Sequence, residues 1–91
     1  MANCFQLCVQ TPGGVILDGR AEYCNLPTDD GSVGILAHHA PMLCAVREGT
    51  ALFRMENGEE KKLHFSAGVA DIRDNTVTIL ADRADNNEAK E

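Results

Sequence analysis

Residues 50–65 read TALFRMENGEEKKLHF, and this stretch decides the fold class of the chain. On both sides of the Asn57-Gly58 pair every second side chain is apolar, which is the period of a β-strand and not of a helix. Asn and Gly both tolerate the positive φ of a type I′ turn, so the pair predicts a hairpin. The apolar side chains that share one face of this hairpin are Ala51, Phe53, Met55, Leu63 and Phe65.

Short apolar or alternating segments continue in both directions, separated by turn residues such as Thr11-Pro12-Gly13-Gly14 and Asp18-Gly19. Such a series predicts an all-β domain, a sandwich or flattened barrel of about ten strands with a short polar C-terminal tail. We expect the sandwich to occupy residues 1–82 and the polar tail residues 83–91. The expected strands are residues 5–10, 15–17, 20–26, 32–36, 42–46, 50–56, 60–65, 67–72 and 76–80.

The length, charge and apolar content of the chain disfavour several classes of binding partner. A chain of 91 residues is the size of one domain. Its net charge of −6 and its unclustered Lys and Arg residues disfavour binding to nucleic acid or to an anionic membrane surface. No apolar run approaches the ~20 residues of a membrane helix. The first residues also lack the basic and then apolar pattern of a secretory signal. We therefore expect a cytoplasmic domain.

The chain contains four cysteines, Cys4, Cys8, Cys24 and Cys44, and no Cys-x-x-Cys pair. In a reducing cytoplasm such residues behave as small hydrophobic side chains. A framework of two disulfides is the alternative, and it requires an exported protein.

The run from Gly31 to Val46 contains no charged residue, although part of it must be loop. Loops lie on the surface, so an uncharged apolar loop indicates contact with a partner. On this interpretation Gly31 and Gly34 allow close approach of the partner's backbone. The side chains that would supply the apolar contact are Val33, Ile35, Leu36 and Met42. The alternative is that the run folds inward and plugs one end of the sandwich.

Catalytic and metal-binding interpretations find little support in the spacing. Adjacent side chains on an extended chain point to opposite sides, so the His38-His39 pair does not easily share one ion. Zinc requires two further ligands, and nothing in the spacing links Cys44 or His64 to this pair. Cys44 with a histidine is a conceivable nucleophile pair, but no orienting carboxylate is marked. The residues therefore favour a partner-binding β-domain without catalytic residues, metal or cofactor.

The uncharged run also carries a family resemblance. Residues 26–41, LPTDDGSVGILAHHAP, resemble the pattern L-P-T-x-D-G-x-x-G-I-L-x-x-H-A-P of the epsilon subunits of F-type ATP synthases. The opening residues 5–12 and the Asp18-Gly19 pair are similar to that family's first strand and turn. Residues 66–69 resemble its S-G-G-F segment, and residues 77–82 match its V-T-V-L-A-D segment. The similarity extends in order over residues 5–82.

The resemblance implies a ten-stranded β-sandwich in the central stalk, a peripheral rotor subunit on the cytoplasmic face of the membrane. Such a subunit is non-catalytic, binds the gamma subunit and the ring of c subunits, and couples proton or sodium transport to ATP synthesis. The expected contacts with the c-ring are Gly31, Ser32, Val33, Gly34, Ile35, His39, Ala40, Pro41 and Met42. The expected contacts with gamma are Thr11, Leu43, Val46 and Val69.

Two departures from the family pattern stand out. Ala67 replaces the first Gly of the S-G-G-F segment, and Val69 replaces its Phe. Family members usually continue into a two-helix C-terminal domain that carries inhibition and, in some members, an ATP site. Residues 83–91 resemble only the start of that domain, which is either missing or naturally absent. The alternative function is a small cytoplasmic protein-binding β-sandwich outside the ATP synthase.

Overall fold

The computed structural model describes residues 3–85, and within them the regular elements are all strands. The prediction of an all-β sandwich is confirmed. None of the described segments is a helix long and apolar enough to cross a membrane. The strands are β1 (Phe5–Thr11), β2 (Gly14–Thr28), β3 (Gly31–Leu36), β4 (Met42–Val46), β5 (Gly49–Met55), β6 (Glu60–Phe65), β7 (Gly68–Arg73), β8 (Thr76–Ala81) and β9 (Ala84–Asp85).

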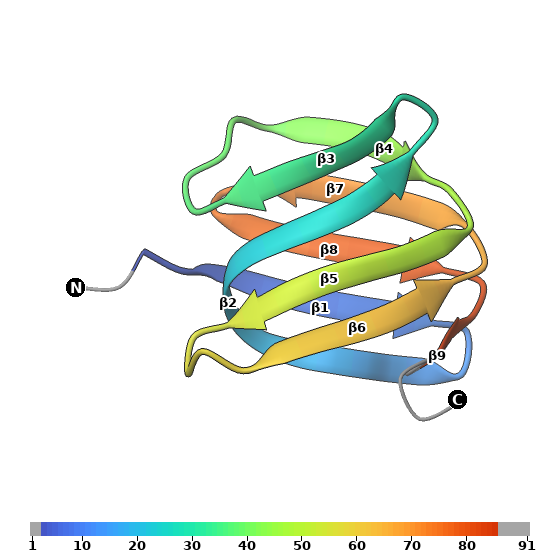
Figure 1. Cartoon of the computed structure of the whole chain (residues 1–91), viewed down its shortest axis with the longest axis horizontal. Helices are drawn as coiled ribbons and strands as arrows, with labels where there is room; N and C mark the ends of the chain where they lie inside the picture. The colour runs from blue at the N-terminus through green and yellow to red at the C-terminus, as the bar shows by residue number, and fades with distance from the viewer. Residues whose placement is uncertain (1–2, 86–91) are drawn as a thin grey trace.

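One continuous sheet folds back on itself to make the two layers of the sandwich (Figure 1). Its strand order is β4-β7-β8-β1-β2-β5-β6-β9, and β3 pairs with β2 beside this path. The β1 and β8 strands run parallel, and the other pairs are antiparallel. The sheet does not close, so β3 and β4 are both edge strands.

The long strand β2 belongs to both layers. Its residues 14–21 pair with β1, and its later residues pair with β3 and β5. The pairing with β5 shifts between Ala21 and Tyr23, an irregularity of the kind that bends a strand from one layer to another. The prediction of two separate strands here is wrong. Asp18 and Gly19 do not turn the chain but pair with Cys8 and Leu7 of β1.

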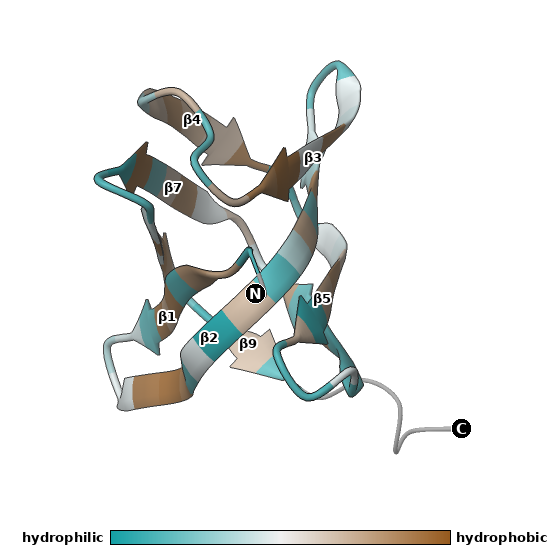
Figure 2. Ribbon diagram, turned by 90° about the vertical axis from the view of Figure 1, so that its left-hand side faces the viewer, coloured by the Kyte–Doolittle hydropathy of each residue, from teal (hydrophilic) through white to brown (hydrophobic). Residues whose placement is uncertain are grey.

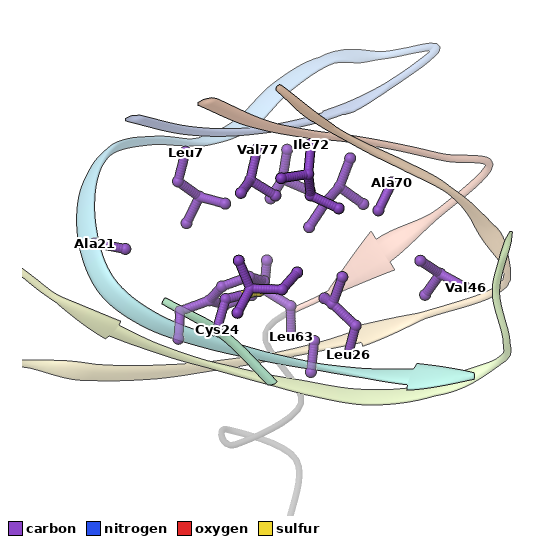
Figure 3. Packing of buried hydrophobic residues seen from close by; sticks show 14 of the residues in the cluster. Leu7, Ala21, Cys24, Leu26, Val46, Leu63, Ala70, Ile72 and Val77 are labelled. Carbon is purple, nitrogen blue, oxygen red and sulfur yellow. The ribbon is translucent and has the colours of Figure 1, made fainter. Parts of the chain in front are cut away.

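Alternation along the strands builds the core. Leu7, Ile72 and Val77 point inward from one layer and meet the side chains of the other layer (Figure 3). Phe53 and Phe65, from the hairpin that predicted the fold, pack edge to face with ring centroids 6.4 Å apart. Complete burial of such a side chain contributes about 1.5–3 kcal/mol. The core is therefore mostly aliphatic with a small aromatic centre.

The β5–β6 hairpin differs from expectation in its turn type. The β5–β6 hairpin is confirmed, but Asn57 does not have positive φ, and Gly58 alone does, at 89°. The Gly58 N–H donates to the Met55 carbonyl at 2.8 Å, which closes a turn that a type I′ geometry does not describe. The pair with positive φ at both residues is Asp74 (52°) and Asn75 (56°), between β7 and β8.

The polar tail was expected to begin at residue 83. Ala84 and Asp85 still pair with Phe65 and His64 of β6, as strand β9. The rest of the expected tail lies outside the described residues.

Candidate docking surfaces

The uncharged run forms one end of the sandwich. β3 and β4 lie at this end, and residues 37–41 connect them (Figures 1 and 2). β3 pairs with β2 along one edge and β4 pairs with β7 along one edge, and the described strands leave their other edges uncovered. A pocket of about 320 Å³ lies here. Its lining residues are Thr28, Asp30, Ser32, Val33, Met42 and Cys44.

Most of the expected c-ring residues reach the surface of this end. Gly31, Ser32, Gly34, Ala40 and Pro41 are exposed, and Val33, His39 and Met42 are half-buried. Ile35 is the exception, with a relative exposure of 0%. Because side chains alternate along β3, Ile35 points into the core, and its neighbour Leu36 points outward with 61% exposed. Ile35 is therefore not available for the expected contact and follows the alternative interpretation, whereas contact of the exposed residues with a partner stays a prediction.

Gly34 has a structural role within the domain. A Cβ at Gly34 would lie 3.2 Å from the ring and the hydroxyl oxygen of Tyr23. The Asn25 amide donates to that hydroxyl at 3.1 Å, and the Arg54 guanidinium lies 5.9 Å from the ring centroid. Gly34 therefore makes room for a side chain of the same domain. Gly31 is needed for its positive φ of 112°, and open space surrounds it.

A residue that sequence analysis missed fixes the connection between β3 and β4. The His38 N–H donates to the Asn75 side-chain oxygen at 2.7 Å, although the two residues are 37 positions apart. The Asn75 amide nitrogen donates to the Cys4 carbonyl at 2.9 Å. In the sequence, Asp74 and Asn75 lie between two expected strands, and a hydrogen bond between distant segments leaves no local signal there.

A second surface lies on the outside of the layer that contains β4, β7, β8 and β1. Val69 pairs with Ala45 on one side and with Leu80 on the other, and all three are exposed. Leu80 pairs with Gln10 of β1, and Gln10 pairs with Val15 of β2. We call this line of five residues across five strands, four of which are apolar and one of which is Gln10, the outer apolar row. Figure 2 shows apolar residues along β4 and β7 on this side of the molecule.

Some of the residues expected to contact gamma lie at this surface, and one of them lies in the core. Leu43 is 71% exposed and Val69 42% exposed, and both lie on the outer surface of their layer. Thr11 lines a pocket of about 410 Å³ together with Leu80, next to the row. Val46 is 2% exposed because it points inward with the alternation of β4, so its expected contact is wrong. Leu80, 52% exposed, was not anticipated.

The four cysteines are free thiols. Burial, and to a smaller extent the Cys44 thiol, raises the pKa of Cys24 to about 12. Burial also raises the pKa of Cys44. Within residues 3–85, no three His, Cys, Asp or Glu side chains come together as a candidate metal site.

The fold is thus a two-layer β-sandwich domain with an uncharged end and an apolar outer row. The chain belongs to the ATP synthase delta/epsilon chain family, because the model of that family's β-sandwich domain matches residues 4–87. The family resemblance seen in the sequence is therefore confirmed.

Relatives at the sequence level carry the same family name. The ATP synthase epsilon chain of Desulfitobacterium hafniense is 40% identical over 85 residues, which are 93% of this chain and 64% of that relative. The chloroplastic epsilon chain of Mesostigma viride is 35% identical over 82 residues, 90% of this chain and 62% of that one. The chain spans less than two thirds of the length of these relatives.

Solved structures share the fold. A chain in the Euglena gracilis mitochondrial ATP synthase, solved with OSCP, F1 and c-ring, matches with a TM-score of 0.91 and 22% identity. That match covers 100% of this chain and 58% of the other. A chain in the central stalk and c-ring structure of the Tetrahymena thermophila mitochondrial enzyme matches with a TM-score of 0.76 and 18% identity, over 94% and 71% of the two chains.

Proposed function

We propose that this chain is a central-stalk rotor subunit of an F-type ATP synthase. In this role it binds the gamma subunit and the c-ring and helps couple proton or sodium transport to ATP synthesis. It lies at the cytoplasmic face of the membrane as a peripheral component of the complex. Membership of the delta/epsilon chain family is the observation that carries the proposal.

The two surfaces give the proposal a geometry. The outer apolar row runs across five strands of one layer, which suits a broad contact with a folded partner, so we assign it to gamma. The uncharged end, with Gly31, Ala40 and Pro41 exposed, suits a smaller contact, so we assign it to the c-ring. Exposed apolar groups in contiguous patches mark interaction sites on small domains.

Co-elution with the gamma subunit from the same source on a sizing column tests the proposal. A stable one-to-one complex is expected. Two folded proteins that elute separately at micromolar concentration would favour the alternative function, a protein-binding sandwich outside the ATP synthase.

We also propose that the domain itself is non-catalytic. Thiolates, and not thiols, are the nucleophilic form of cysteine. A raised pKa leaves Cys24 and Cys44 almost wholly protonated at neutral pH. Thiol modification at pH 7.5 should therefore be slower in the folded chain than in the unfolded chain for both residues. A cysteine that reacts faster in the folded chain would point to a thiol-dependent enzyme.

A further inference from the structure

Asn75 uses both its backbone and its side chain to join three parts of the chain. Its carbonyl accepts the Gln6 N–H at 3.1 Å, and its amide bridges Cys4 and His38. The residue sits in the two-residue β7–β8 turn with φ of 56°, a left-handed conformation that Asn adopts more readily than most residues. The turn therefore holds the amide in one place, facing the entrance of β1 and the connection between β3 and β4.

The chemistry of the amide explains why Asn suits this position. A backbone carbonyl oxygen needs a hydrogen-bond donor, and a backbone N–H needs an acceptor. A neutral side-chain amide carries both a donor and an acceptor on one planar group. The Nδ2 atom faces the Cys4 carbonyl and the Oδ1 atom faces the His38 N–H, so this amide orientation satisfies both partners. Aspartate would keep the acceptor and lose the donor.

The segment that Asn75 holds is the tip of the uncharged end. His38 has a φ of 63°, which is unfavourable for a residue with a side chain, and its N–H is the group that Asn75 binds. The hydrogen bond of His39, from its ring Nδ1 to the Ala40 carbonyl, is local. In the described part of the chain, the His38–Asn75 bond is the side-chain hydrogen bond that ties residues 37–41 to another element.

We propose that Asn75 is the positioning residue of this end loop, and that it sets the placement of His39, Ala40 and Pro41 for docking. The docking half of this inference rests on the proposed contact between the end loop and the c-ring. The positioning half stands on the hydrogen bonds alone.

Hydrogen exchange of the His38 amide, followed by NMR, tests the positioning half. Asn75→Gly keeps the backbone conformation and removes both side-chain bonds, so exchange of the His38 amide should accelerate at least tenfold. Asp74→Gly is the matched control, because Asp74 has the same φ sign in the same turn and an exposed side chain. Unchanged exchange at His38 in Asn75→Gly, with the β5–β6 amides still protected, would overturn the inference.

Asn75→Asp provides the test if the glycine variant fails to fold. The aspartate carboxylate still accepts the His38 N–H and tolerates the turn. Protection of the His38 amide should stay within about threefold of the parent chain. Acceleration as large as that expected for glycine would contradict the assigned acceptor.

Binding to the purified c-ring, with the gamma subunit present, tests the docking half. Asn75→Gly should weaken binding about tenfold, and Asp74→Gly should leave it unchanged. Ala40→Arg, at the exposed tip, should abolish it. Binding lost in Ala40→Arg and unchanged in Asn75→Gly would overturn this inference and leave the proposed function standing. Binding unchanged in both variants would contradict the placement of the c-ring at this loop.

Discussion

The ring of Tyr23 on β2 occupies the space that a side chain at Gly34 on β3 would need. The two residues lie on adjacent paired strands, and an added Cβ would come within 3.2 Å of the ring. Gly34 therefore contributes to the architecture of the uncharged end.

Gly34→Ala should lower the free energy of unfolding by about 1 kcal/mol, because the Tyr23 ring must shift in a packed layer. Chemical denaturation measures the loss. Gly13→Ala is the control, since the nearest atom to its added Cβ is the Thr11 hydroxyl oxygen at 3.8 Å. Tyr23→Leu combined with Gly34→Ala should recover part of the loss. Full additivity of the two changes would show that the residues do not share this space.

Gly68→Ala should be more damaging, by about 2–3 kcal/mol, because the obstacle is backbone. The added Cβ would collide with the Leu80 carbonyl oxygen and approach the Ala81 Cα to 2.9 Å. This position is the second Gly of the S-G-G-F segment, which the chain retains. The denaturation midpoint of the variant is compared with that of the parent chain. An unchanged midpoint would mean that β7 and β8 move apart without loss of stability, which would contradict the prediction.

Stability should fall at alkaline pH because of Cys24. Its pKa is about 12 in the folded chain against the ordinary thiol value of 9.0, so between these values the unfolded chain loses a proton that the folded chain keeps. This contribution is fully present below pH 9 and declines above it, by up to about 1.4 kcal/mol per pH unit. Unfolding measured in reductant from pH 8 to 10.5 should show a shallower decline in Cys24→Ala. If the free energy of unfolding declined in parallel with pH in the parent chain and in Cys24→Ala, the result would contradict the burial of the Cys24 thiol.

Local pattern predicted the strands well where one face is buried. The hairpin of residues 50–65 is confirmed, because the buried residues Phe53 and Phe65 alternate with positions that are less buried. The local sequence pattern failed at Asp18 and Gly19, where a pair of residues typical of turns lies inside a strand that crosses between layers. The bend of β2 depends on packing across the sandwich, which the local sequence does not record.

The surfaces could be predicted only in part. The missing charge indicated a run that forms one end of the sandwich, but it did not distinguish inward from outward side chains, so the buried residues Ile35 and Val46 were included among the expected contacts. Leu80 and Asn75 escaped notice because their significance arises from strands and loops distant in the sequence. Register between strands decides which apolar residues form one surface.

The affinity for the gamma subunit of one matched pair of variants, measured by calorimetry, tests the central claim most directly. Val69 and Ile16 are both β-strand residues with similar exposure, 42% and 44%, but only Val69 lies in the outer apolar row. We predict that Val69→Glu weakens binding at least tenfold, or about 1.4 kcal/mol, and that Ile16→Glu binds as the parent chain does. Equal affinities in the two variants would contradict the assignment of this surface to gamma.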